Sequence, residues 1–522
     1  MRWRRRQAGP DGPRVIVVGA GFAGLSAVNR LARTGAQVMI IDRNGYSTFQ
    51  PLLYQVATAG LNPGDVAYSV RALTRKLGVR FRLGELTGID SRTRRITLAD
   101  GGQYDYDYLV LATGVTAAYY GVPGADENTL GLYTHRDAVT LRDHIMARLE
   151  RMNIGPAKDL NFTVVGGGAT GVELAGALAE LYATLDRAFP DVDSRRVHIT
   201  LVEQFPVLLG PFHESLQRYA HDQLRHRGVD VHLNAKIRRV TPWSVQLENG
   251  DDLPSDLSVW AAGVTAPAAV AGWGLPQGRG GRISVGPDLR VVGQDRIFAA
   301  GDIAVSAEHP VPQLAQPAIQ EGRHIAGQIR RLMTGQPMVP FSYHDKGIMA
   351  TIGRRSAVVQ LPHGLRFRGT IAWLAWLALH LITLLGGRNR LSALLNLSYR
   401  YLAWGHGGWI IVGDDPPAVL PGGPPQAVPD AAGTTQVPSG AAGATQGSPG
   451  PAQGSPGATQ GSPGPAQGSP GPAQDSPGPA QESPGTGGTT WAAAGTEGTS
   501  RDSAGGGTAP ASPPSQGGGR AG

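Results

Sequence analysis

The feature that most constrains this chain is a glycine-rich turn between a buried strand and a helix. The strand is Val-Ile-Val-Val, an apolar run typical of a parallel strand covered on both faces. Gly19, Gly21 and Gly24 follow with the spacing G-x-G-x-x-G, which permits a tight turn, approach of a pyrophosphate and close helix packing. The next strand ends on Asp42, whose carboxylate can accept ribose hydroxyl groups. This order predicts a Rossmann-like dinucleotide-binding unit.

The same arrangement occurs a second time in the chain. The strand Asn-Phe-Thr-Val-Val leads into Gly166, Gly168 and Gly171, which keep the spacing, and a long helix and a further strand end on Glu203. Two nucleotide sites in one chain indicate two dinucleotides. A resident flavin and a visiting nicotinamide give the arrangement that hydride transfer needs.

The residue at the end of that strand bears on which nicotinamide is used. Glu203 can accept the ribose diol of NADH and would repel the 2′-phosphate of NADPH. Arg195 and Arg196 precede the strand and could reach round to the phosphate, so the sequence favours NADH without excluding NADPH.

Composition removes several reaction classes. The 522 residues contain no cysteine, so a redox disulphide, a persulphide and a thiolate or iron–sulfur site are all excluded, and no metal site is expected. The net charge of +7 favours an anionic membrane surface. No basic stripe interleaved with aromatic residues is visible, so no nucleic-acid partner is expected.

The stretch after the second strand resembles a known family. It is apolar and aperiodic, and from Phe49 it reads F-x-P-L-L-Y-Q-V-A-T, followed by Pro63 and Arg71. This segment resembles the flavin-domain signature of the type II (single-subunit, non-proton-pumping) NADH:quinone oxidoreductases. The later run Y-D-Y-L-V-L-A-T-G, which contains Thr113, is similar to the strand that closes their first flavin segment. The resemblance covers roughly residues 14–413 and implies the two-domain α/β architecture of the flavoprotein disulphide reductases.

The resemblance also implies which residues bind the two dinucleotides. Tightly bound FAD is expected at Gly19, Gly21, Gly24, Asp42, Arg43, Thr113, Gly301, Asp302 and Gln316. NADH is expected at Gly166, Gly168, Gly171, Glu203, Ala262 and Gly263. Gly301 and Asp302 end a short apolar strand, and the resemblance implies that this aspartate hydrogen-bonds the flavin's ribityl or phosphate side.

A short motif later in the chain points to the quinone. The run A-Q-P-A-I-Q-E-G matches the family's A-Q-x-A-x-Q motif, and Pro317 suits the first position of a helix. Gln316 and Gln320 are four apart and can share a helix face, where uncharged amides can hydrogen-bond a quinone carbonyl without adding charge to an apolar tunnel. The positive end of this helix would stabilise negative charge on reduced flavin.

Two charged residues complete the predicted catalytic set. Glu173 follows the second glycine turn; the resemblance implies a place near nicotinamide and flavin, with a role in substrate binding or proton handling, whereas a helix-dipole acid is the alternative. Lys346 opens a K-G-x-M-A-x-I-G segment, which in the family lies by flavin and quinone. Its ammonium could stabilise reduced flavin or assist protonation, and a surface lysine is the alternative.

The region 366–413 raises the question of a membrane. Its first apolar run, 370–385, has about sixteen residues, short of the ~20 that a span needs, and Trp373 and Trp376 with flanking arginines suit a membrane interface. A second stretch is amphipathic, so we expect two helices lying in one leaflet. A buried core helix, a dimer interface and a single spanning helix remain alternatives; His380 weighs against the last.

The predicted organisation therefore has six parts. They are a basic disordered arm (1–13), the first FAD segment (14–118), the NADH domain (119–263), the second FAD segment (264–365), the membrane-associating helices (366–413) and a disordered tail (414–522). Gln-x-Ser-Pro-Gly recurs in the tail every seven residues, and proline and glycine in each unit exclude a coiled coil.

The sequence thus predicts a respiratory NADH dehydrogenase. Hydride would pass from NADH to FAD and two electrons on to menaquinone or ubiquinone, without proton pumping. A homodimer is expected, peripheral on the cytoplasmic face of the cell membrane. Sulfide:quinone oxidoreductase shares the architecture, but its cysteines are absent. A soluble NADH oxidase or diaphorase, or a non-enzymatic flavin redox sensor with an interaction tail, stays open.

Overall fold

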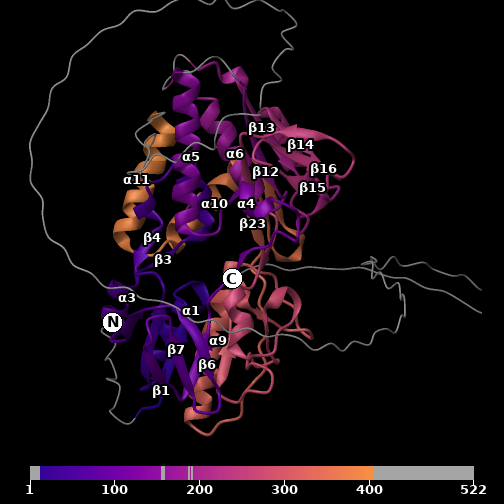
Figure 1. Ribbon diagram of the computed structural model, residues 1–522. Coiled ribbons are helices and arrows are strands. Elements are labelled where there is room, and N and C mark those ends of the chain that lie inside the picture. Colours follow the sequence, from indigo (N-terminus) through magenta and orange to yellow (C-terminus); the bar gives the residue numbers. More distant parts are fainter. Residues whose placement is uncertain (1–11, 155–158, 186–188, 190–191, 404–522) are drawn as a thin grey trace, which may run out of the picture. The chain divides into compact units, whose positions relative to one another are not determined.

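The computed structural model describes residues 12–154, 159–185, 189 and 192–403 (Figure 1). The predicted basic arm, apart from its last two residues, and the whole predicted tail lie outside the described residues. The final part of the predicted membrane-associating segment, 404–413, lies outside them as well.

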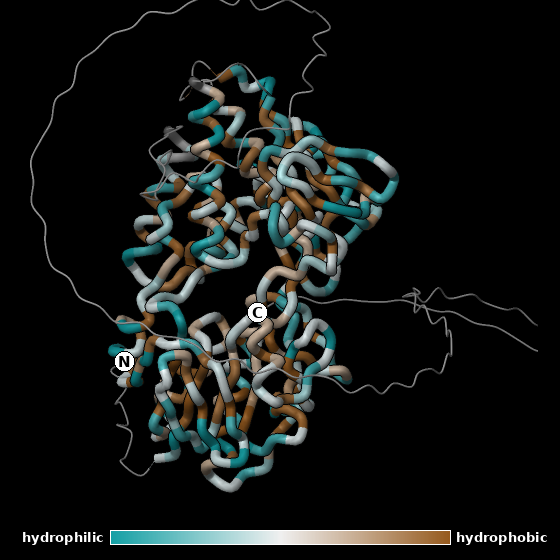
Figure 2. Tube along the Cα trace, in the orientation of Figure 1, coloured by the Kyte–Doolittle hydropathy of each residue, from teal (hydrophilic) through white to brown (hydrophobic). Residues whose placement is uncertain are grey.

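The first nucleotide-type sheet has five parallel strands in the order β21-β9-β1-β2-β5. Their bounds are β1 Arg14–Val18, β2 Gln37–Asp42, β5 Arg80–Leu83, β9 Tyr108–Leu111 and β21 Ile297–Ala299. The central strand β1 is buried along Val15 to Val18 because neighbouring strands and helices cover it on every side. Figure 2 shows hydrophobic segments through the interior of this region.

The second sheet repeats this design with the order β11-β18-β12-β13-β14, again wholly parallel. Its strands are β11 Thr129–Gly131, β12 Leu160–Val165, β13 Val197–Val202, β14 Val229–His232 and β18 Leu257–Trp260. The predicted pair of Rossmann-like units is therefore confirmed.

Two short strands carry the chain between the sheets. Strand β10 (Thr116–Ala117) pairs antiparallel with β19 (Val264–Thr265), so the outgoing and returning segments lie side by side. The later strand β21 then joins the first sheet beside β9, so that sheet is built from two separate parts of the chain.

Helices cover these sheets in the same way at both glycine turns. Helix α1 (Phe22–Leu31) follows β1 and packs against α9 (Ala315–Met333), while α6 (Ala169–Tyr182) follows β12. A Cβ at Gly322 would lie 2.1 Å from the Ala23 carbonyl oxygen, which shows how closely α1 and α9 approach. The remaining earlier helices are α2 Leu53–Ala57, α3 Val70–Leu77, α4 Ala125–Asn128, α5 His135–Ile154 and α8 Glu214–His226.

Smaller antiparallel sheets occupy the periphery. Their strands are β3 Tyr46–Thr48 with β4 Ala67–Ser69; β6 Leu86–Asp90, β7 Arg95–Leu98 and β8 Gln103–Asp105; and β15 Ile237–Val240, β16 Ser244–Leu247 and β17 Asp252–Pro254. The parallel pair β20 Ile283–Ser284 and β22 Ala304–Val305 lies near β21 in sequence.

The chain ends, within the described residues, in a sheet and two helices. Strands β23 (Ile348–Gly353), β24 (Ser356–Gln360) and β25 (Arg366–Arg368) are antiparallel, and α10 (Thr370–Thr383) packs on β24 before α11 (Gly387–Ala403). Trp376 is buried in the same core as α6. Among the helices in the described ranges, none combines the length and apolar composition required for a transmembrane span.

Candidate functional site

The first glycine turn is shaped by packing at two positions and left open at the third. Gly19 has φ +105°, and a Cβ there would lie 2.1 Å from the Ala112 carbonyl oxygen; a Cβ at Gly24 would lie 1.9 Å from the Gly19 oxygen. A Cβ at Gly21 would meet no described atom within 4 Å. Gly21 therefore faces open space, where a diphosphate can approach the backbone.

The strand end beside this turn carries the predicted ribose-binding acid. Asp42 accepts hydrogen bonds from the Ala20 N–H at 2.6 Å and the Asn44 N–H at 2.7 Å, and burial raises the pKa of its carboxyl group. Arg43 points to the exposed surface and pairs with Glu85 at 3.8 Å. Asp42 thus lies at the glycine turn, as predicted, whereas the Arg43 side chain is engaged elsewhere.

An unsatisfied polar atom supports a ligand in this cradle. The hydroxyl of Thr113 is buried and has no hydrogen-bond partner among the described residues. A buried orphan hydroxyl is unfavourable unless another group pairs with it. Together with the open face of Gly21, it fits the predicted FAD site.

The second glycine turn repeats the same geometry. Gly166 has φ +109°, a Cβ at Gly171 would lie 1.8 Å from the Gly166 oxygen, and a Cβ at Gly168 would meet no described atom within 4 Å. Glu203 accepts hydrogen bonds from the Gly167 N–H at 2.5 Å and the Phe205 N–H at 2.9 Å. The acid at this strand end folds back on its turn as Asp42 does.

The two arginines that could have bound the 2′-phosphate of NADPH form ion pairs with acids other than Glu203. Arg195 pairs with Asp193 at 2.9 Å, and Arg196 pairs with Asp159 at 3.0 Å. Neither pair includes Glu203. The structure therefore gives the NADPH alternative no support from these side chains.

The return from the second sheet brings Ala262 and Gly263 beside the outgoing segment. The indole N–H of Trp260 donates to the Ala118 oxygen at 2.8 Å and the Ala262 oxygen at 3.2 Å. Gly263 has φ +82°, and the hydroxyl of Tyr120 occupies the place where its Cβ would stand. The backbone conformation favours glycine here, whereas the exposed Tyr120 side chain could move away from a Cβ.

The turn at Gly301 and Asp302 holds a buried polar cluster. Tyr133 donates from its hydroxyl to Asp302 Oδ2 at 3.1 Å, Arg282 Nε donates to the Asp302 backbone oxygen at 2.6 Å, and burial raises the pKa of Asp302. The N–H of Gly301 donates to Glu321 at 2.5 Å. Neither Tyr133 nor Glu321 was predicted from the sequence. Tyr133 belongs to no motif, and the only signal for Glu321 is that it follows Gln320 in the glutamine motif, on the helix face that is buried.

The side chains of the two predicted quinone-site glutamines differ in their hydrogen bonding. Gln320 is bound twice to the backbone of His344: its Nε2 donates to the oxygen at 2.9 Å, and its Oε1 accepts from the N–H at 3.0 Å. The amide of Gln316 makes no hydrogen bond to another described residue. Gln316 is therefore the freer of the two, and Gln320 fixes the segment that leads to the exposed Lys346.

The prediction of Pro317 at the first helical position is wrong. Helix α9 begins at Ala315, so Pro317 is the third residue. No intrahelical hydrogen bond is lost, because the first N–H groups of a helix have no partner within it.

Glu173 lies where three segments meet. Its Oε1 accepts from the Thr351 N–H at 3.2 Å, and the side chain of Trp376 in α10 lies beside its carboxyl group. Burial raises the pKa of Glu173 to about 8, although the Thr351 N–H and the Trp376 side chain oppose this. An acid that is largely protonated at neutral pH can donate as well as accept a hydrogen bond.

A row of aromatic rings connects this acid with the first glycine turn. Trp376 stacks on His380 with ring centres 4.1 Å apart, His380 meets Phe49 edge-on at 6.1 Å, and Phe49 meets Phe22 at 5.9 Å. The row joins α10 to the first residue of α1. Trp373 and Trp376 were expected at a membrane interface, but both are buried.

The opposite face of α10 and the outer face of α11 are apolar and exposed. The large side chains on it, which we call the apolar face, are Ile371, Leu374, Leu379, Ile382, Leu391, Leu394, Leu395 and Tyr399. Arg366 and Arg368 of β25 precede it and are exposed. Within the described residues, no group of His, Asp or Glu could hold a metal ion.

Known proteins match this chain over most of its described length. The pyridine nucleotide-disulphide oxidoreductase family matches residues 13–322. The type II NADH:quinone oxidoreductase Ndh of Mycobacterium tuberculosis is 36% identical over 417 residues, covering 76% of this chain and 89% of the relative. A type II NADH:quinone oxidoreductase of Staphylococcus aureus is 32% identical over 362 residues, 67% of this chain and 89% of the relative.

Solved structures show the same fold. NDH2 from Plasmodium falciparum in complex with NADH superposes with a TM-score of 0.70 at 19% identity, covering 77% of this chain and 100% of that one. The sulfide:quinone oxidoreductase of Aquifex aeolicus gives 0.61 at 18% identity, covering 76% and 96%. These similarities, together with the family match, confirm the predicted architecture.

Proposed function

This chain belongs to the type II NADH:quinone oxidoreductases, within the pyridine nucleotide-disulphide oxidoreductase family, and we propose that its two glycine cradles hold FAD and NADH for electron transfer to a quinone. It is an FAD-dependent NADH dehydrogenase. The observation that carries this function is the duplication of the cradle, with an open glycine and a strand-end acid in each copy. Because the chain has no cysteine, electrons cannot leave through a disulphide.

We assign FAD to the residues 14–118 and 264–365 and NADH to the residues 119–263. Asp42 would orient the adenosine ribose of FAD, and Thr113 and Asp302 would hydrogen-bond the remainder of the cofactor. When bound, FAD accepts hydride from the nicotinamide and passes two electrons to quinone. The protein's contribution is orientation and electrostatics.

Glu203 supports NADH as the substrate. Its carboxylate lies at the second glycine turn, where it would accept the ribose diol and oppose a 2′-phosphate. The ion pairs of Arg195 and Arg196 add to this, since these cations already have acid partners.

Gln316 is our candidate for direct contact with the quinone. It lies in the first turn of α9, whose N-terminus has no side-chain cap and whose free N–H groups favour negative charge nearby. Gln320 would act by holding the segment before Lys346. Glu173, protonated at neutral pH, would hold a proton at its carboxyl group between α6 and α10.

The apolar face of α10 and α11 supports attachment to a lipid surface. Its exposed leucines and isoleucines cover two successive helices, and exposed arginines precede them, as at the boundary of an anionic bilayer. We propose a peripheral enzyme on the cytoplasmic face of the cell membrane, and a homodimer as the resemblance implies. Burial of the same face between two subunits is the competing use.

The direct test is turnover of purified protein in vesicles that contain menaquinone. NADH-dependent quinone reduction, much faster than oxygen consumption without quinone, is the expected result. NADH oxidation that depends on oxygen and ignores quinone would identify a soluble-type oxidase or diaphorase and overturn the proposal.

A further inference from the structure

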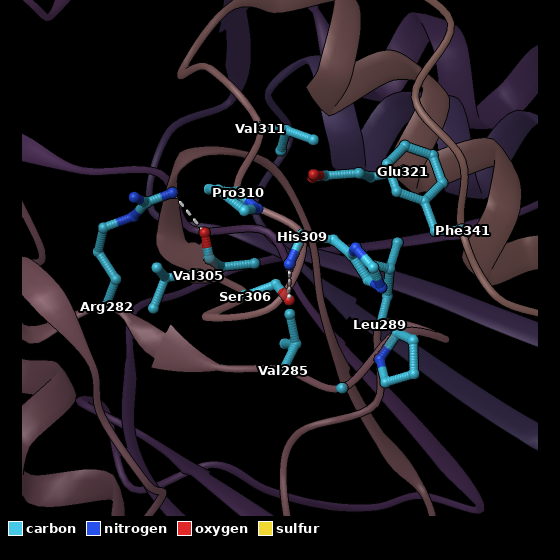
Figure 3. Close-up of a pocket in the computed structure, with 13 residues that line it drawn as sticks. Arg282, Val285, Leu289, Val305, Ser306, His309, Pro310, Val311, Glu321 and Phe341 are labelled. Carbon is cyan, nitrogen blue, oxygen red and sulfur yellow. Dashed lines mark hydrogen bonds between the residues drawn. The ribbon is translucent and has the colours of Figure 1, made fainter. Parts of the chain in front are cut away.

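A small pocket lies between Glu321 and the segment 304–311 (Figure 3). It has a volume of about 40 Å³ and is lined by Arg282, Val305, Ser306, His309, Glu321 and Phe341 among others. A site needs roughly 10–15 Å³ to hold one water molecule, so this pocket has room for a short chain of waters. Most of the lining is apolar, and the polar groups that would hold these waters are those of Arg282, Ser306, His309 and Glu321.

The buried end of the pocket is an acid. Glu321 is 3% exposed, and Figure 3 shows its carboxyl group directed into the pocket toward Pro310 and Val311. Its Oε2 accepts from the Gly301 N–H at 2.5 Å. The same carboxyl group therefore touches the predicted FAD-binding turn on one side and a water-sized pocket on the other.

Few charges act on this acid. Asp302 from the turn raises its pKa, whereas Arg282 from the segment before β20 lowers it, and His309 lines the same pocket. Helix α1 packs on α9 through small residues, with Gly322 against Ala23. Burial dominates and raises the pKa of Glu321 to about 7.

We propose that Glu321 is a proton-coupled positioning residue: it takes one proton from solvent through this pocket when two electrons enter the neighbouring flavin, and releases it when they leave. The inference rests on the FAD assignment of the proposed function. Negative charge added near a buried carboxylate favours the protonated form of that carboxylate. The Glu321 carboxylate (COO⁻) therefore binds one proton from solvent and becomes COOH. The acid transfers no electrons, and through the Gly301 N–H it would tune the cofactor's potential.

The test is a redox titration of the bound flavin between pH 6 and 8.5, with an enzymatic reductant and indicator dyes. It uses neither NADH nor quinone, so its failure is separate from failure of the proposed function. The measured quantity is the slope of the flavin reduction potential against pH. This slope is expected to be steeper in the wild type than in Glu321→Gln by about 30 mV per pH unit, the value for one extra proton per two electrons. Glutamine can still accept from the Gly301 N–H.

The exposed Glu308, nearby in sequence, gives the matched control. Glu308→Gln should keep the wild-type slope. A carboxylic acid band that appears in the infrared difference spectrum on reduction, and is lost only in Glu321→Gln, would support the same assignment. Equal slopes in the wild type and Glu321→Gln would overturn it.

A second variant covers the case in which Glu321→Gln does not retain flavin. Arg282→Gln removes the cation that opposes protonation of Glu321. The pH at which the slope changes should then move upward. A slope change at the wild-type pH would also overturn the proposal.

Discussion

The side chain of Trp376 in α10 lies beside the carboxyl group of Glu173 in α6 and favours its charged form, although the two residues are 203 positions apart. The contact places an acid of the second glycine unit against the helix that bears the apolar face. Since Trp376 also stacks on His380, and His380 reaches Phe49, the acid, the apolar helix and the flavin-side segment form one packed unit. A substitution that displaces α10 should therefore also change the surroundings of the Glu173 carboxyl group.

The raised pKa of Glu173 predicts a pH-dependent difference in stability. The folded protein holds the proton up to about pH 8, whereas the unfolded chain loses it near the ordinary value of 4.5. Stability from this group is full below pH 4.5 and falls as pH rises to 8. Relative to the wild type, Glu173→Gln should become progressively more stable across that window, by on the order of 5 kcal/mol at pH 9. A constant difference between the two melting profiles from pH 4.5 to 9 would contradict the assignment.

The glycine cradles predict opposite outcomes for neighbouring substitutions. Gly21→Ala places a methyl group in open space at φ −80°, so the apoprotein should be unchanged or more stable by about 0.4–1 kcal/mol, while FAD binding is lost. Gly24→Ala drives a methyl group into the Gly19 oxygen and should destabilise the fold by about 1–3 kcal/mol or more. Flavin content after purification and apoprotein melting separate the two. FAD retention in Gly21→Ala would refute the cradle assignment.

The turn before β4 is fastened to α11 by a buried acid. Asp65 accepts from the Ser392 hydroxyl and the Asn396 amide, both at 2.6 Å. Asp65→Ala leaves three donors unpaired, because the Asn62 N–H also bonds this carboxylate, and it should cost about 2–4 kcal/mol, with faster hydrogen exchange in α11. The exposed Asp126 provides the control, because Asp126→Ala should change neither quantity. Unchanged exchange in α11 after Asp65→Ala would show that this contact does not hold the helix.

The apolar face predicts a membrane phenotype without a folding phenotype. Ile371 and Ile382 are 70% and 67% exposed, so serine at both positions should alter folding stability by less than about 0.5 kcal/mol. Binding to anionic vesicles should weaken by at least about tenfold, since each buried isoleucine contributes roughly 1.5–3 kcal/mol. Val292→Ser, at an exposed residue outside this face, should bind as the wild type does. If the double serine variant floats with vesicles as the wild type does but has a different oligomeric state, the apolar face would instead be a dimer interface.

The parts predicted from sequence are those that depend on neighbours along the chain. Both glycine turns and their strand-end acids follow from local order, because strand, turn and helix are consecutive. The contacts of Asp302 with Tyr133, and of Gly301 with Glu321, join different segments and have no local signature. Likewise, Trp376 was assigned to an interface from its short apolar run and the flanking arginines, whereas its burial depends on the packing of α10 against β23 and β24 and on the Tyr54 ring.

Electrons are expected to leave the flavin for quinone past Gln316. The measurement is anaerobic stopped-flow absorbance at the flavin band, with NADH first and a menaquinone analogue second, in detergent-solubilised protein. We predict rapid bleaching by NADH and rapid recovery with quinone. Gln316→Ala should slow only the recovery, by about tenfold for one lost hydrogen bond. Gln336→Ala, at an exposed glutamine just beyond α9, should slow neither phase. Bleaching without recovery on quinone, in the wild type, would contradict the account.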